Sequence, residues 1–149
     1  MAEEPDTPAE LKARALRYLI RREHSRAELE RKLAPHAESD EVLSGVLDAL
    51  LSRKQLSDER FAEERARTLS RKYGAAKIRQ DLRARGVPDE VIDRLPAPGE
   101  EERARRILAR KYREPADTRE ERAKRARFLQ GRGFSYDVIK KALALADAE

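Results

Sequence analysis

The sequence predicts an all-α protein made of three tandem three-helix repeats that form an elongated, curved array. Ala, Glu, Arg and Leu dominate its 149 residues and β-branched residues are scarce, a composition that suits helices and disfavours strands. Only 39% of the residues are hydrophobic, so thin helical layers are favoured over one thick core. The third observation is a sequence pattern that recurs three times along the chain.

The recurring pattern is a helix leucine followed by a valine nine residues later. The leucine–valine pairs are Leu33 and Val42, Leu82 and Val91, and Leu129 and Val138. Successive copies are 49 and 47 residues apart. A unit of this size cannot bury its apolar stripe alone, so neighbouring copies should stack, and the resulting array would suit an extended partner.

The first helix of each repeat is expected where apolar residues recur at helical spacing. The three expected ranges are 9–22, 57–72 and 99–113. Ser25 and Glu28 predict a capping box at the start of the second helix, in which each side chain accepts the backbone N–H of the other residue. His24 is expected to end the first helix, where the helix dipole favours a partly charged imidazole.

A glycine is expected at the end of the second helix in two of the three copies. Gly86 and Gly133 suit a left-handed residue there, and replacing either by alanine should destabilise the protein by about 1 kcal/mol or more. Ser135 suits the N-cap of the last helix. The first copy has Ala37 in place of the glycine and Pro35 before it, so its turn is expected to differ.

These elements predict a tail followed by three repeats. The expected parts are an acidic N-terminal tail at 1–10 and helical repeats at 11–56, 57–98 and 99–149. Pro96, Pro98 and Gly99 mark the break between the second and third repeats.

The formal net charge of +5 is unevenly distributed along the chain. Residues 1–50 carry a net charge of −3, residues 51–100 carry +3 and residues 101–149 carry +5. This gradient indicates an anionic partner for the middle and last repeats. The alternative is that surface helices are simply rich in Arg and Glu.

Basic side chains on the expected helices are the candidate contacts to that partner. One stripe, turned away from the apolar residues of its helix, contains Arg103, Arg106, Arg110 and Arg113. Arg125 occupies a position that is apolar in the other copies, so either its helix has rotated or Arg125 snorkels or contacts a partner. The full candidate set is Arg79, Arg83, Arg85, Arg103, Arg106, Arg110, Lys124, Arg125, Arg127 and Arg132.

Several classes of function are disfavoured by what the sequence lacks. Cysteine is absent, which excludes a disulfide scaffold, a thiol nucleophile and a Cys-ligated zinc site. His24 and His36 share no metal-binding spacing, and no glycine-rich phosphate loop is present. We therefore expect no cofactor, no metal and no enzymatic activity. The acidic N-terminus and the lack of a long apolar run predict a cytoplasmic protein with no membrane contact.

Three stretches of sequence, taken together, resemble a known family. They are YLIRREHSRAEL at 18–29, LSDERFAE at 56–63 with KIRQDLRARGV at 77–87, and RFLQGRGFS at 127–135. In this order and at these intervals they resemble the signatures of the regulatory protein RecX family. The resemblance runs from about residue 11 to residue 143.

The resemblance implies three tandem three-helix repeats in a monomer that acts in the cytoplasm without catalysing a reaction. It implies binding to the filament that the RecA recombinase forms on DNA, within the helical groove of that filament. The bound protein would restrain the filament's ATPase and strand exchange, and hence act in DNA recombination, DNA repair and the SOS response. The residues alone leave two alternatives, a helical DNA-binding module that contacts phosphates without sequence preference and an inert repeat scaffold.

Overall fold

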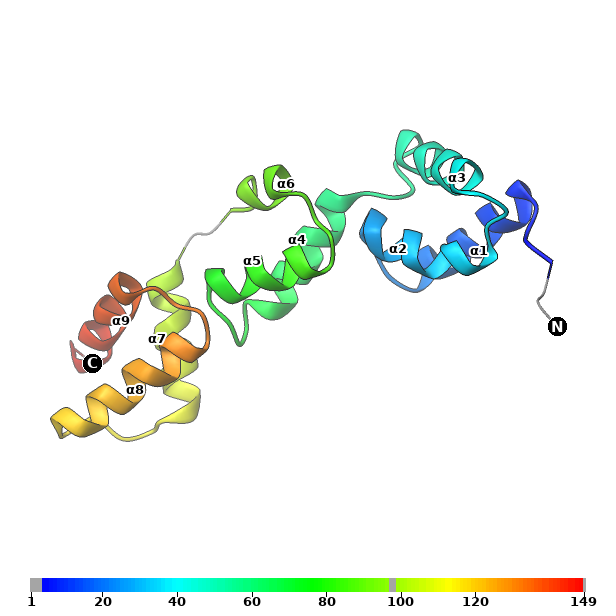
Figure 1. Ribbon diagram of the computed structural model, residues 1–149. Helices are drawn as coiled ribbons and strands as arrows, with labels where there is room; N and C mark the ends of the chain where they lie inside the picture. Colours follow the sequence, from blue (N-terminus) through cyan, green and yellow to red (C-terminus); the bar gives the residue numbers. More distant parts are fainter. Residues whose placement is uncertain (1–3, 97–98, 149) are drawn as a thin grey trace. The chain divides into compact units, whose positions relative to one another are not determined.

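The computed structural model describes residues 4–96 and 99–148, and its regular elements within these ranges are all helical (Figure 1). The elements are α1 (Pro8–Arg21), α2 (Arg26–Leu33), a 3-10 helix η1 (Ala34–His36), α3 (Asp40–Ser52), α4 (Asp58–Leu69), α5 (Ala75–Ala84), α6 (Asp89–Asp93), α7 (Glu100–Lys111), α8 (Arg119–Gly131) and α9 (Tyr136–Ala148). The described residues contain no strand, which confirms the all-α prediction. Two parts of the expected organisation lie outside the described residues. They are residues 1–3 of the expected acidic tail and residues 97–98, which include Pro98 at the end of the expected second repeat.

Local capping chemistry explains where the first helices begin. Thr7 caps α1 and Ser25 caps α2, and each forms a capping box with the glutamate three residues later.

The first helices of the second and third repeats are shorter than the sequence predicted, since α4 ends at Leu69 and α7 at Lys111. After α4, the carbonyls of Ser70 and Tyr73 accept hydrogen bonds from a side chain instead of from a further helical turn.

Glycine corners end the second helices of the last two repeats. Gly86 has φ 81° and Gly133 has φ 94°, the left-handed region that favours glycine. The N–H of the residue after each glycine donates back to a helix leucine, at 3.0 Å for Val87 to Leu82 and 3.2 Å for Phe134 to Leu129. These bonds complete a Schellman motif. The first repeat instead uses η1 and then Ala37 at φ −83°, which confirms that its turn differs.

The described residues form two compact units. Unit 1 takes its residues from Met1–Glu64 and Leu82–Arg94, and unit 2 from Arg65–Asp81 and Leu95–Glu149. Helices α4 and α5 therefore contribute to both units, and the boundaries expected between the three repeats stay a prediction.

Each unit has its own apolar core. In unit 1, leucines of α1, α2 and α3 pack together, and Leu11, Leu33 and Leu47 are fully buried. In unit 2, the core lies among α7, α8 and α9 and includes Leu108 and Leu129. The three repeat leucines, Leu33, Leu82 and Leu129, are all buried, as the recurring pattern requires.

Candidate partner interface

In unit 1, the corner that carries Gly86 packs on the first turn of α2. A methyl group at Gly86 would overlap the Cβ atom of Ala27. The Ser25 hydroxyl donates a 2.6 Å hydrogen bond to the carbonyl of Arg85 and also accepts the N–H of Glu28 at 3.0 Å. The Arg85 guanidinium in turn pairs with the Glu28 carboxylate at 2.9 Å. Ser25 therefore caps α2 and joins it to the corner, and Arg85 is held in the same joint.

Unit 2 contains a second joint of the same kind, between the Gly133 corner and the start of α5. The N–H of Gly74 donates to the carbonyl of Arg132 at 2.7 Å, and the N–H of Ala76 donates to the carbonyl of Gly133 at 3.2 Å. A Cβ atom on Gly133 would lie 2.7 Å from the backbone nitrogen of Lys77. The sequence pattern predicts that both corner glycines end helices, and the structure shows in addition that each corner docks on another helix.

His24 lies in the interior of unit 1 with only 1% of its surface exposed. Its Nε2 atom accepts a 2.9 Å hydrogen bond from the Lys32 ammonium, which can only donate, so Nδ1 carries the proton and donates to the carbonyl of Arg22 at 3.0 Å. Burial lowers the pKa of His24, which keeps the imidazole neutral at pH 7. The expected partly charged histidine at the end of α1 is therefore wrong, because α1 ends at Arg21 and the ring is buried beyond that end.

Arg103 is part of the fold of unit 2 and does not belong to an exposed stripe. Its side chain is only 20% exposed and pairs with Glu100. Its guanidinium donates to the carbonyls of Ser70 at 2.7 Å and Tyr73 at 2.9 Å, and lies 5.7 Å from the ring centre of Phe134. Burial lowers the pKa of Arg103, yet its polar partners all accept hydrogen bonds from the charged form.

Two further candidates, Arg125 and Arg132, also have their partners within unit 2. Arg125 is 11% exposed, lies 4.5 Å above the ring centre of Tyr112, and donates to the carbonyl of Glu114 at 2.7 Å. The guanidinium of Arg132 stacks over Phe128 at 5.0 Å and donates to the carbonyl of Lys72 at 3.2 Å. Both arginines cover aromatic rings. Packing within the chain therefore explains why Arg125 stands at a position that is apolar in the other copies.

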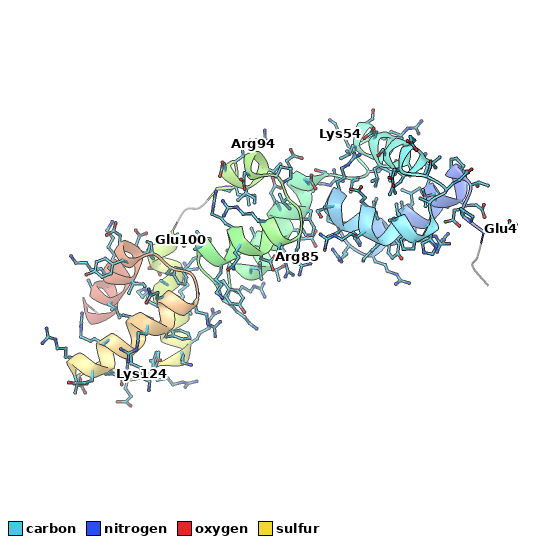
Figure 2. The ribbon with its side chains drawn as sticks, viewed as in Figure 1. Glu4, Lys54, Arg85, Arg94, Glu100 and Lys124 are labelled. Atoms are coloured by element: carbon cyan, nitrogen blue, oxygen red, sulfur yellow. The ribbon has the colours of Figure 1, made fainter. Side chains whose placement is uncertain are left out.

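The other candidates are more accessible, and Figure 2 shows how side chains, including the labelled Lys124 on α8, project from the helices. Arg79 is half-buried, whereas the exposed candidates are Arg83, Arg106, Arg110, Lys124 and Arg127. Arg83 pairs with Asp89 at 2.9 Å, and Arg106 lies 3.6 Å from Glu102. Arg110 donates to the carbonyl of Arg71. Exposed ion pairs of this kind contribute little stability, so these cations can exchange partners at low energetic cost.

The different roles of Arg103 and Arg106, on the same helix, can be tested by stability. Replacing Arg103 by methionine should lower the free energy of unfolding by about 1–3 kcal/mol, because two backbone carbonyls and Glu100 lose their donor. The matched change Arg106→Met should alter it by less than about 0.5 kcal/mol, since that side chain is exposed. Urea denaturation followed by circular dichroism measures both, and equal effects would contradict the assignment.

Consecutive three-helix domains joined at glycine corners, with exposed cations on their helices, define a tandem helical-repeat protein. Family models for the first, second and third three-helix domains of RecX match residues 12–50, 57–95 and 99–143. The chain belongs to the RecX family, whose curated members carry the name regulatory protein RecX.

Similar proteins cover nearly the whole chain. The regulatory protein RecX of Leptothrix cholodnii is 46% identical over 93% of this chain and 90% of its own length. That of Ralstonia nicotianae is 43% identical over 97% of this chain and 92% of its own length. The crystal structure of RecX from Lactobacillus salivarius is 25% identical and matches with a TM-score of 0.84, over 95% of this chain and 97% of that one.

Two other kinds of feature are absent from residues 4–96 and 99–148. No helix there combines the length and apolar character that crossing a bilayer requires. No group of three or more histidines and carboxylates there is placed to hold a metal ion.

Proposed function

We propose that this protein, as a monomer, binds the nucleoprotein filament that RecA forms on DNA and restrains its ATPase and strand-exchange activities. Its biological setting would be DNA recombination and repair. The observation that carries the proposal is the match of all three RecX domains, in order, across residues 12–143. The relatives are named regulatory proteins, which supports a role in binding rather than in catalysis.

The distribution of exposed cations supports an anionic binding partner. Arg106 and Arg110 on α7 and Lys124 and Arg127 on α8 are all exposed. A filament of recombinase on DNA offers phosphates and acidic side chains, with which these cations can pair. The residues of unit 2 include 20 Lys and Arg and 11 Asp and Glu, a net charge of +9, whereas those of unit 1 carry −4, so unit 2 supplies most of the electrostatic attraction.

Two compact units in one chain also provide a physical route to inhibition. Once one unit is bound, the other binds its own site at a high effective concentration, which strengthens the attachment without new contacts. Binding restrains a filament only if the bound protein favours one of the filament's states over another. A chain attached at two sites would favour the state in which both sites are correctly spaced and would oppose rearrangements that separate them.

Affinity for coated and bare DNA tests this proposal. We expect the protein to bind recombinase-coated single-stranded DNA at least about tenfold more tightly than bare DNA of equal length, a difference near 1.4 kcal/mol. An independent DNA-binding module would show the reverse preference, because the recombinase coat hides phosphates. Fluorescence anisotropy with labelled DNA and with labelled filament measures both affinities, and tighter binding to bare DNA would overturn the proposal.

A further inference from the structure

Unit 2 has a groove between α8 and α9 that neither the family match nor the proposed function assigns. Its volume is about 530 Å³, within the roughly 300–1,000 Å³ typical of sites that hold small organic groups. Phe134, Ile139 and Leu143 give the groove an apolar floor, and Arg127 from α8 and Lys140 from α9 add two cations to its lining. The groove can therefore accept an apolar group that carries negative charge beside it.

Tyr136, the first residue of α9, also lines this groove and is 76% exposed. A tyrosine ring left in solvent contributes little to the core. Burying it against a ligand would lower the free energy in proportion to the apolar area removed from water. The side chain of Tyr136 is not needed to cap α9 either, because the Ser135 hydroxyl already accepts the N–H of Val138 at 3.3 Å. The ring is thus available to stack with a ligand.

The charges of the lining select the type of ligand. Among the described residues, the groove lining contains Arg127 and Lys140 and no acidic side chain, so it attracts anions. A strand of single-stranded DNA offers phosphates together with flat, unstacked bases, which stack on exposed aromatic rings with little regard to sequence. Duplex DNA does not offer the same combination, because its bases are stacked and paired inside the helix.

We propose that the α8–α9 groove binds single-stranded DNA, with a base stacked on Tyr136 and the adjoining phosphates paired with Arg127 and Lys140. This site rests on the proposed function only for the source of the strand, which is the DNA of the filament or DNA beside it. Lys141 is exposed on α9 but does not line the groove, so it provides a matched cation outside the site.

The test uses the full chain and a fluorescent oligothymidine of about 12 nucleotides, within the usual range of sites for single strands. Tyr136→Ala should weaken binding about tenfold, whereas Tyr136→Phe, which keeps the ring, should bind within about twofold of the parent. Arg127→Gln and Lys140→Gln should each reduce the slope of log affinity against log salt by about 0.7, and Lys141→Gln should leave it unchanged. Exposure of all four side chains predicts unchanged thermal midpoints, which serve as the folding control.

The outcomes separate this site from the proposed function. No measurable binding of the oligothymidine by the parent, or equal affinity for parent and Tyr136→Ala, would overturn the groove as a DNA site. Loss of filament binding in Tyr136→Ala with oligothymidine affinity unchanged would also overturn it, and would assign the groove to a protein segment. Ring-dependent oligothymidine binding in a protein that ignores the filament would support the groove and refute the proposed function.

Discussion

Replacing Gly86 by alanine is expected to lower the free energy of unfolding by roughly 2–5 kcal/mol, more than the backbone effect alone. A left-handed residue with a side chain costs about 1–2 kcal/mol. The added methyl would also overlap the Cβ atom of Ala27, and such overpacking costs about 1–3 kcal/mol because neither methyl can rotate away. Gly133→Ala should have a comparable effect, since its Cβ would lie 2.7 Å from the backbone nitrogen of Lys77.

Two other glycines provide matched controls for these changes. Gly45 lies within α3 and Gly131 ends α8, and a Cβ atom on either would meet no atom within 4 Å. Gly45→Ala and Gly131→Ala should therefore leave stability unchanged or raise it by up to about 1 kcal/mol, as expected for glycine in a helix. Urea midpoints for the four variants measure this difference. Corner variants as stable as these controls would show that the two joints do not hold the repeats together.

Reversing two exposed charges on α7, with Arg106→Glu and Arg110→Glu together, is expected to weaken filament binding about tenfold or more at low salt. Each reversal removes an attraction to an anionic surface and adds a repulsion, and each exposed pair contributes up to about 1 kcal/mol. Arg79 is less suitable for this test, because its side chain is half-buried.

The matched control for this pair lies on α1, where Arg17 and Arg21 are also exposed and four residues apart. Arg17→Glu with Arg21→Glu makes the same change in net charge within the segment of net charge −3, and should weaken binding less. Every phosphate that a variant no longer neutralises should reduce the salt slope of the affinity by about 0.7–0.9, whereas pairing with acidic side chains responds more gently to salt. Equal affinity of the α7 double variant and the parent would place the interface elsewhere.

Much of the fold could be predicted from the sequence because its signals are local. The capping box of Ser25 and Glu28 and the glycines at positions 86 and 133 act on backbone groups a few residues away. The buried leucines of the repeats follow from helical periodicity in the same way. The packing of the two glycine corners on other helices is harder to predict, because the corners meet small residues, Ala27 and Gly74, which give a weaker sequence signal.

The errors and omissions at the candidate interface arise from tertiary contacts. Helical periodicity places Arg103 beside Arg106. The loop after α4, however, brings two backbone carbonyls to Arg103 and not to Arg106. His24 can be buried because the carbonyl of Arg22 and the ammonium of Lys32 form hydrogen bonds with its two ring nitrogens. The sequence spacing does not reveal these contacts. The groove at Tyr136 exists only because α8 and α9 lie together, so no motif within either helix predicts it.

The most direct test of regulation is ATP turnover by the cognate RecA recombinase on single-stranded DNA, measured with increasing amounts of this protein. We expect turnover to fall to a plateau as the filament becomes saturated. The Arg106→Glu, Arg110→Glu variant should need about tenfold more protein for the same effect, as its weaker binding requires. Turnover that stays unchanged while the protein is shown to saturate the filament would contradict regulation of RecA by this chain.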